Sequence, residues 1–466
     1  MQGLSKKVVD EILKHGNLYE VGGCVRDSLL GMGIAEKDRD YLVTRIEFER
    51  LVKVLKKYGH VDLVGKSFGV IKFTSCNNGS DHNVTYDIAL PRSEFSTGIG
   101  HRDFQVDFDH TLPVEEDLKR RDFTINAIAR NLRDNELVDP YGGQEDLKHG
   151  LIRMLAPRTF EDDPLRMLRA VQFAARFEFE IEPQTFEAIR QNAGLISAVS
   201  PERIQEELNK LLTKAKKPSR GFILMDQTRL LKIILPELAL AIGVDQPGGY
   251  HAHDVFLHSI YTVDELPQDN LTLRLAGLLH DIAKPRTKIV RDEKANFYGH
   301  DQQGAEMAAE ILQRLRYSNQ VIKDVKVLIK EHMFTSEMSD KGVRRLIKRT
   351  GIDRIYDLLE LRRSDVRAQG MGNTTPEIDE LEGRIRSELE EQVPLGVKQL
   401  AIDGNDIMQE FDIPPSPLVG EILSHLLEIV LDYPEKNNKE VLIPVSYTHL
   451  RAHETVLDLV CRLLLE

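Results

Sequence analysis

The chain has 466 residues, of which 41% are hydrophobic and 29% charged, so it can bury substantial cores and is not compositionally disordered. At roughly 100–200 residues per domain, this length suggests about three domains. The 62 Lys and Arg residues against 75 Asp and Glu residues give a net charge of −13, which excludes a uniformly basic nucleic-acid coat but not a local basic groove.

Cysteine usage and hydropathy indicate the compartment. Cys24, Cys76 and Cys461 are too few and too widely spaced for a disulfide framework or a structural zinc site, which favours a reducing cytoplasm. The N-terminal residues are charged and amphipathic, without the apolar region of a signal peptide. No apolar run approaches the roughly 20 residues of a membrane span, so no membrane partner is expected.

The predicted elements change character along the chain. Residues 1–146 mix short strand-like runs with helical stretches, which predicts an α+β head built on a β-sheet. Helical periodicity dominates from there on, so the remainder is predicted to be all-helical. Within this helical part, Pro247-Gly248-Gly249 is a plausible joint and the polar stretch 370–379 a plausible linker.

The first motif is a glycine turn, Gly22-Gly23, between a strand-like run and a helical run that contains Arg26 and Asp27. Paired glycines let the backbone approach a phosphate, and the N–H groups at a helix start can bind it. Arg26 can add a bidentate, charge-assisted contact. Alone, such a pair is usually only a turn.

A pair of acids, Asp38 and Asp40, follows this turn. Carboxylates two positions apart on a strand point to the same side, and like charges so close are costly without a cation. Two Mg²⁺ ions would relieve the repulsion, activate a 3′-hydroxyl and stabilise the leaving pyrophosphate. Asp87 is the candidate third acid. The alternative, a solvated acidic strand end, is disfavoured by the adjacent glycine turn.

These motifs belong to a longer ordered set. GGCVRD (22–27), KDRD (37–40), RRDFTINAIA (120–129), DPYGG (139–143) and DDPLRMLRAVQFAARF (162–177) together resemble the bacterial-type CCA-adding enzymes, which are tRNA nucleotidyltransferases. The resemblance covers about residues 17–444. It implies a polymerase-β-like nucleotidyltransferase head at 1–146, followed by a helical neck at 147–220, a helical body at 221–372 and a helical tail at 373–444. It also implies Mg²⁺-dependent addition of CCA to the 3′ end of tRNA from CTP and ATP, without a nucleic-acid template.

The resemblance also implies site residues. Asp38 and Asp40 match the family's metal-binding acids. The nucleotide-binding candidates are Gly22, Gly23, Arg26, Asp27, Arg121, Asp122 and Asn126. Other interpretations remain for the last three, because Arg121 and Asp122 could form a surface ion pair and Asn126 could cap a helix.

Asp163, Arg166 and Arg169 recur at three-residue spacing, which predicts that they lie along one side of a helix. The carboxylate can accept from the exocyclic amine shared by cytosine and adenine, and Arg can donate to ring acceptors, so UTP and GTP would be mismatched. The alternative is an i,i+3 salt bridge on a solvated helix. Gln172 stands where the family often has Arg. If that Arg contacts phosphate or stabilises the base-reading residues, Arg176 is the candidate to supply part of this role.

The segment 91–108 is rich in Gly, Ser and charge, as expected of a mobile loop. In the family such a loop helps switch specificity from C to A. Arg92, Glu94, Arg102 and Asp103 are present, which favours full CCA addition over the CC-only or A-only activity of some relatives.

The body contains six candidate metal ligands, and LRLAGLLHDIAKP (273–285) is the most specific part of the pattern. Their order resembles the HD phosphohydrolase superfamily, which implies a site for Mg²⁺ or a divalent transition metal and a phosphohydrolase activity. Isolated core histidines, or a metal site without turnover, are the alternatives. The ligands would be His258, His280, Asp281, His300, His332 and Asp365.

Two further segments complete the chain. Lys214, Lys216, Lys217 and Arg220 form a basic cluster that can contact tRNA phosphates or simply face solvent. Residues 445–466 resemble one reading frame of a sequencing-library adapter and are interpreted as non-native, the alternative being a genuine amphipathic helix.

Two other functions compete with CCA addition. A poly(A) polymerase would share the head motifs, but the HD body is closer to CCA-type enzymes. An HD phosphohydrolase with a nucleotide- or RNA-binding head is disfavoured by the intact acid pair. The sequence leaves the oligomeric state open.

Overall fold

The computed structural model describes residues 3–33, 39–63, 70–75, 84–96, 104–246, 252–291, 294–370, 372 and 374–447, without the side chains of 93–96, 104–107, 291 and 294. It contains two compact units, Met1–Ala239 and Leu240–Glu466. In this described part of the chain, no helix has both the length and the apolar character needed to cross a bilayer.

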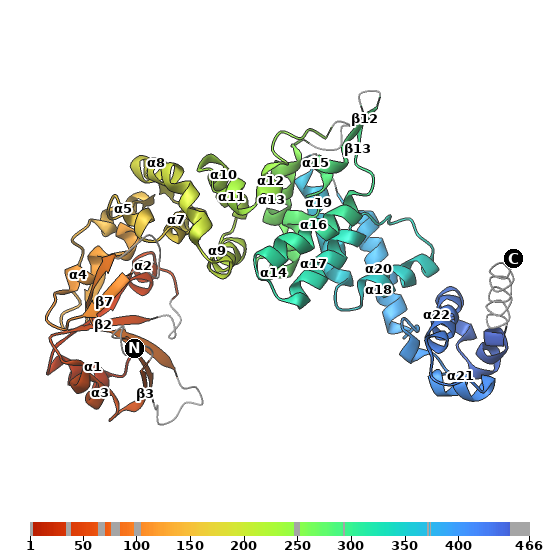
Figure 1. Ribbon diagram of the computed structural model, residues 1–466, viewed down its shortest axis with the longest axis horizontal. Coiled ribbons are helices and arrows are strands. Elements are labelled where there is room, and N and C mark those ends of the chain that lie inside the picture. The colour runs from red at the N-terminus through yellow and green to blue at the C-terminus, as the bar shows by residue number, and fades with distance from the viewer. Residues whose placement is uncertain are drawn as a thin grey trace, which may run out of the picture. The chain divides into compact units, whose positions relative to one another are not determined.

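The head is built on a mixed seven-stranded sheet, which confirms the predicted α+β fold (Figure 1). Only the central β2 and β5 pair in parallel; the other neighbours are antiparallel. In sheet order the strands are β3 (Gly59–Leu63), β4 (Val70–Ser75), β5 (Thr85–Ala89), β2 (Asp40–Thr44), β1 (Asn17–Val21), β8 (Ala129–Asn131) and β9 (Leu137–Val138).

Helices α1 (Lys6–Leu13) and α3 (Phe48–Leu55) lie side by side against one face of this sheet (Figure 1). Their apolar residues recur at helical spacing, and alternate strand residues such as Phe73 and Ile88 meet them in a common core. Burying each aliphatic side chain fully stabilises the fold by roughly 1.5–3 kcal/mol, so this core holds the two helices against the sheet. The opposite face is partly apolar, because Leu42 of β2 packs with Val114 and Leu118 of α4 (Val114–Lys119), and it also carries the exposed Asp40 and Asp87.

The rest of the first unit is mainly helical, but it also contains a two-stranded parallel sheet of β10 (Leu151–Ile152) and β11 (Glu180–Ile181), which the prediction of an all-helical neck did not include. Helix α7 (Leu165–Phe177) packs against α9 (Pro201–Lys214) and α10 (Pro218–Gln227). The expected head–neck boundary falls inside α5 (Gly143–His149), and the neck–body boundary falls inside α10, within the first unit. The finer division into neck, body and tail stays a prediction.

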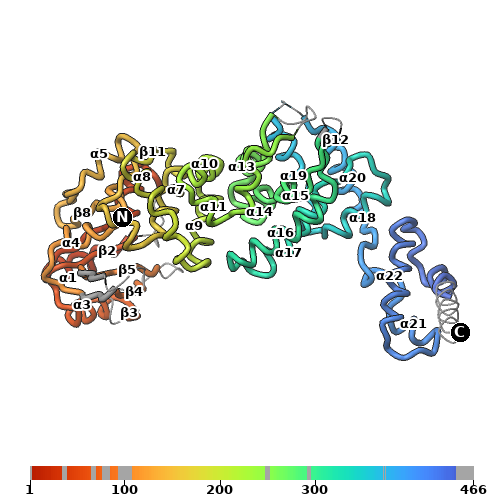
Figure 2. Tube along the Cα trace, turned by 45° about the horizontal axis from the view of Figure 1, so that its top comes forward, coloured from red at the N-terminus to blue at the C-terminus, as the bar shows by residue number. Residues whose placement is uncertain are grey.

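The second unit is a helical body with a smaller C-terminal group of helices (Figure 2). In the body, α13 packs on α14 and α19, and α16 packs on α17. A separate apolar cluster joins α21 and α22. The main helices are α13 (Val255–Glu265), α14 (Leu271–Leu279), α16 (His300–Arg314), α17 (Asn319–Glu331), α18 (Asp340–Thr350), α19 (Ile355–Ala368), α20 (Pro376–Glu390), α21 (Gly404–Phe411) and α22 (Pro417–Asp432).

The final segment is described only through residue 447. Tyr447 donates a hydrogen bond to Glu410 Oε1 at 2.7 Å and packs against Phe411. Residues 448–466 lie outside the described residues, so the interpretation of 445–466 as non-native stays a prediction.

Candidate active site

Two of the three predicted acids are neighbours in the sheet. Asp40 opens β2 and is the register partner of Asp87 on the parallel strand β5. Both are exposed, whereas Tyr41 and Ile88 point into the core beneath α1 and α3. Paired carboxylates projecting from one face are oxygen ligands of the kind that Mg²⁺ prefers. Asp38 lies outside the described residues.

The glycine turn lies beside these acids and depends on glycine. Gly22 has φ +77° and precedes α2 (Gly23–Leu29); a Cβ there would lie 2.4 Å from Arg121 Nη1. The backbone conformation and the close approach of Arg121 therefore both require glycine at this position. Arg26, on α2, is buried; it donates to Asp27 Oδ1 at 2.7 Å and to Asn126 Oδ1 at 2.6 Å.

Asp122 links the head to α7. It accepts from Asn126 Nδ2 at 2.8 Å and lies 2.7 Å from Arg169 Nη2. Burial would raise the pKa of Asp122, but the charge of Arg169 and the hydrogen bond from Asn126 outweigh it and lower the pKa to about 2. The alternative interpretation of Arg121 and Asp122 as a surface ion pair is wrong, because Arg121 Nη2 lies 3.2 Å from Asp117 Oδ2 and Asp122 is buried.

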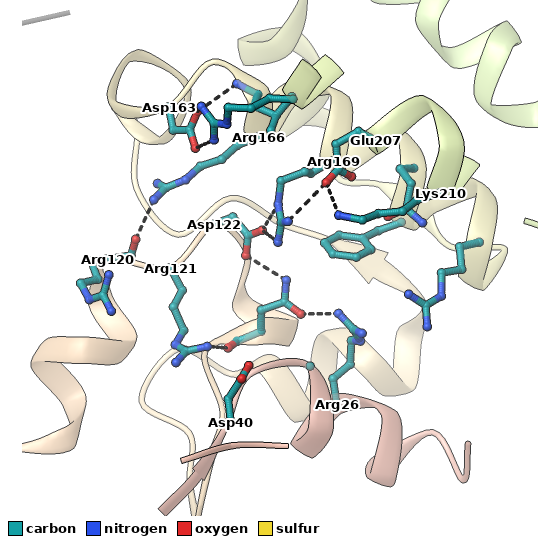
Figure 3. Close-up of a pocket in the computed structure, with 17 residues that line it drawn as sticks. Arg26, Asp40, Arg120, Arg121, Asp122, Asp163, Arg166, Arg169, Glu207 and Lys210 are labelled. Atoms are coloured by element: carbon teal, nitrogen blue, oxygen red, sulfur yellow. Dashed lines mark hydrogen bonds and ion pairs between the residues drawn. The ribbon is translucent and has the colours of Figure 1, made fainter. Parts of the chain in front are cut away.

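These residues surround a pocket of about 500 Å³ (Figure 3). Asp163 and Asp40 stand at opposite ends of the view, with Asp122 between them. The pocket carries many more cationic than anionic side chains, which suits a polyanion such as a triphosphate. It is lined by Gly23, Arg26, Asp40, Arg120, Arg121, Asp122, Asn126, Asp163, Leu165, Arg166, Arg169, Gln172, Phe173, Arg176, Arg203, Glu207 and Lys210.

The predicted base-reading residues line this pocket, with one correction. Asp163 does not lie on the helix with Arg166 and Arg169 but just before it, because α7 begins at Leu165. The alternative i,i+3 salt bridge is also wrong: the Asp163 carboxylate accepts from Arg203 at 3.2 and 2.8 Å. Arg166 instead donates to the Arg120 carbonyl at 2.8 Å.

Helix α9 contributes three pocket residues that sequence reasoning missed, namely Arg203, Glu207 and Lys210. Glu207 is buried, accepts from Lys210 Nζ at 2.8 Å and lies 3.6 Å from Arg169 Nη1. Their spacing of four and three residues places them on one helix face, which is the signal in the sequence.

The segment 91–108 and the basic cluster can be compared with their predictions only in part. Part of the segment 91–108 forms a hairpin of β6 (Arg92–Ser96) and β7 (Phe104–Phe108), but Arg102, Asp103 and the side chain of Glu94 lie outside the description. Its role in specificity stays a prediction. In the basic cluster, Arg220 pairs with Glu180 at 2.5 Å, so that cation is partly neutralised.

In the second unit, the six predicted HD residues converge. They form two potential ligand groups, each with its ligand atoms within 4.8 Å of one another: His258, His280 and Asp365, and Asp281, His300 and His332. His258 Nε2 lies 3.0 Å from Asp365 Oδ1, and His280 Nε2 lies 3.2 Å from Asp281 Oδ2. Each member is buried, which is costly unless the groups bind a cation or one another.

Three of the histidines are oriented by backbone carbonyl groups of their own segments. The Nδ1 atoms of His280, His300 and His332 lie 2.8, 2.7 and 2.6 Å from the carbonyl oxygens three residues earlier, at Gly277, Phe297 and Ile329. A carbonyl only accepts, so Nδ1 carries the proton and Nε2 offers its lone pair to the cluster. Backbone-oriented imidazoles of this kind are typical metal ligands.

The electrostatics of the cluster agree with this geometry. Burial opposes ionisation of Asp281, but His280 and Lys284 hold the pKa of this carboxyl well below its usual range. Burial, together with the neighbouring His280, lowers the pKa of His332 to about 4, which keeps that ring neutral. Burial opposes protonation of His280, but the charge of Asp281 outweighs burial and raises the pKa of His280, so a metal bound there would displace the proton of that ring. Anionic carboxylates and neutral imidazoles are the forms that bind divalent metals, so the donor set fits the predicted site.

Three known protein families match successive segments of the chain. Residues 18–153 match the poly A polymerase head domain, residues 178–242 the probable RNA- and SrmB-binding site of polymerase A, and residues 248–379 the HD domain. An A-adding tRNA nucleotidyltransferase of Deinococcus radiodurans is 38% identical over 343 residues, which is 70% of this chain and 77% of that protein. The chain belongs to the CCA-adding tRNA nucleotidyltransferase family.

A second relative supports this family assignment, and a solved structure shares the fold. A Multifunctional CCA protein of Neisseria gonorrhoeae is 34% identical over 341 residues, covering 71% of this chain and 78% of that protein. The crystal structure of the Bacillus stearothermophilus CCA-adding enzyme in complex with CTP shares the fold, with a TM-score of 0.67 and 24% identity over 96% of this chain and 97% of that one. The chain is therefore an enzyme of the nucleotidyltransferase class that also carries an HD domain.

Proposed function

We propose that this protein adds or repairs the 3′-terminal CCA of tRNA from CTP and ATP, without a nucleic-acid template. One observation carries the proposal: a single pocket has the Asp40 end of the sheet on one side and Asp163 and Arg166 on the other. The two sides are suited to phosphoryl transfer and to base recognition, respectively. The names of the curated relatives support the same activity.

The chain's own residues have separable roles in this proposal. Asp40 and Asp87, together with Asp38, would hold Mg²⁺, which when bound supplies positive charge at the transferring phosphoryl group. Arg26 and Arg121 bind phosphate or ribose oxygens beside the glycine turn.

At the other end of the pocket, Asp163 accepts from the exocyclic amine of cytosine or adenine. Arg166 donates to a ring acceptor. A uracil or guanine base would present an oxygen where Asp163 needs a donor, so UTP and GTP would be rejected.

The test uses purified protein, a tRNA that ends at the discriminator base, and each labelled nucleotide. We expect incorporation of CTP and ATP that stops at CCA, and none with Asp40→Ala. Addition of A alone, to tRNA that already ends in CC, would identify an activity like that named for the Deinococcus relative. Absence of incorporation with every tRNA end would refute the proposal.

We propose in addition that the HD cluster binds a divalent metal and hydrolyses a phosphate ester. The convergence of six buried ligands supports this second activity. His280→Ala should remove the bound metal, measured by elemental analysis after loading with Mn²⁺ or Ni²⁺, and leave CCA addition unchanged. His149→Ala, on an exposed turn of α5, is the matched control. Equal metal content in the wild type and His280→Ala would contradict the site.

A further inference from the structure

Within the described residues, most buried side-chain polar atoms without a hydrogen-bond partner belong to the two candidate sites. Folded proteins satisfy nearly all buried polar groups, so each exception requires a reason. In the HD cluster the exceptions include the Nε2 atoms of His280 and His300, which a metal would satisfy. In the nucleotide pocket they include both polar atoms of Gln172, a residue without a role so far.

Gln172 is 1% exposed and lines the pocket from α7. Neither its Nε2 nor its Oε1 has a hydrogen-bond partner among the described residues. It follows Arg169 by three residues and precedes Arg176 by four, and both of these also line the pocket, so the three share one helix face. A buried amide with both ends unpaired is less stable than an apolar side chain of the same shape, so packing does not explain it.

The neighbours of Gln172 on α7 place it between two functional regions. Toward the start of the helix, Arg169 contacts Asp122. Asp163, at the base-reading end of the pocket, lies just before the helix begins. Toward the end of the helix, Arg176 Nη2 lies 3.6 Å from Asp27 Oδ2 on α2, the helix that begins at the glycine turn. Gln172 therefore lies between the region assigned to the base and the region assigned to the phosphates.

The chemistry of the Gln172 amide restricts which ligand groups it can bind. The arginines of the pocket already offer charged donors to phosphates, whereas an amide is neutral and offers one acceptor together with two donors. It is matched by an uncharged group that both donates and accepts. A nucleotide carries such groups on its ribose hydroxyls and on the edge of its base.

We propose that Gln172 contacts the incoming nucleotide and determines specificity, pairing through its amide with a ribose hydroxyl or a base edge. This inference rests on the proposed nucleotidyltransferase function. The bound nucleotide satisfies the amide, and the free enzyme carries the cost of leaving it unpaired. Loss of the amide therefore has opposite effects on the free protein and on nucleotide binding.

The decisive variant is Gln172→Met, which keeps the shape and removes both hydrogen-bonding atoms. We expect its thermal midpoint without nucleotide to equal or exceed that of the wild type, while the KM for CTP and ATP rises about tenfold. Val171→Ala, which truncates a fully buried neighbour on α7, should instead lower the midpoint and leave KM unchanged. Unchanged KM values in Gln172→Met would overturn the proposal, whatever its midpoint.

Competing nucleotides distinguish the two ligand groups. If the partner is a ribose hydroxyl, Gln172→Met should selectively reduce the preference for CTP over dCTP. If it is a base edge, the preference for CTP over UTP should fall. Should Gln172→Met fail to fold, Gln172→Asn withdraws the same amide by one methylene and should show the same loss.

Calorimetric binding of CTP without tRNA separates this inference from the proposed function. A wild type that binds CTP about tenfold more tightly than Gln172→Met supports the contact even if no tRNA is extended. Equal affinities would overturn the contact even if CCA addition is observed.

Discussion

Arg203 on α9 donates hydrogen bonds to both carboxylate oxygens of Asp163, at 3.2 and 2.8 Å, from a position 40 residues further along the chain. The contact leaves the remaining lone pairs of Asp163 in a fixed direction. The proposed base-reading carboxylate is therefore held in place before a nucleotide arrives, as preorganised recognition requires.

Arg203→Lys should lower base discrimination more than it lowers the rate of correct addition. Lysine keeps the charge but lacks the two-pronged geometry, so the carboxylate can rotate. We expect the ratio of kcat/KM for CTP over UTP to fall about tenfold. Arg190→Lys, in an exposed pair on α8 (Pro183–Asn192), should leave the ratio unchanged. A ratio unaffected by Arg203→Lys would mean that Asp163 needs no such support.

Asp40→Asn and Asp87→Asn should each lower kcat by roughly 100-fold or more, because each removes an anionic metal ligand. Single-turnover extension of tRNA with CTP is the measurement. Asp62→Asn, on the exposed β3 of the same sheet, controls for loss of a surface charge. If Asp87→Asn retains the wild-type rate, Asp87 is not a metal ligand and Asp38 and Asp40 must suffice.

Gly22→Ala should impair both folding and nucleotide binding. The new Cβ would meet Arg121 Nη1 at 2.4 Å, at a backbone φ of +77°. Gly31→Ala is the matched control, since Gly31 has φ +68° but no heavy atom within 4 Å of the added Cβ. Both variants should lose about 1 kcal/mol of unfolding free energy to backbone strain. Only Gly22→Ala should also raise the KM for CTP, and equal KM values in the two variants would count against the role of Arg121.

The stability of the first unit should depend on pH through Asp122. Its pKa is about 2 in the folded state against 3.8 for an unperturbed Asp carboxyl, so it stabilises the fold fully above about pH 4 and ceases to do so as the pH falls through 2. The contribution is about 2 kcal/mol. We expect the stability difference between the wild type and Asp122→Asn, measured by urea unfolding, to shrink between pH 5 and pH 2.5. A constant difference over that range would show that the carboxylate is not stabilised as described.

Sequence patterns predicted the types of element and many of the pocket residues, and the family resemblance predicted that the six HD residues form one site, but local periodicity alone did not show which residues would meet. Alternation along a strand shows which face a residue occupies, yet the pairing of Asp40 with Asp87 depends on the order of strands across the sheet. Likewise, helical spacing indicated Arg166 and Arg169 but not the contribution of Arg203, because contacts between helices depend on packing over long sequence separations. Local periodicity carries no information about such partners.

In the HD cluster, His280, His300 and His332 are each held by a carbonyl oxygen three residues earlier, within the same turn of backbone. Each ring therefore keeps its angle to its own segment when neighbouring helices shift. Repacking of distant apolar residues would change the distances between ligand nitrogens without disturbing any single ligand. The size of ion that the proposed metal site would accept is thus open to adjustment by substitutions far from the cluster, while the six candidate ligands stay the same.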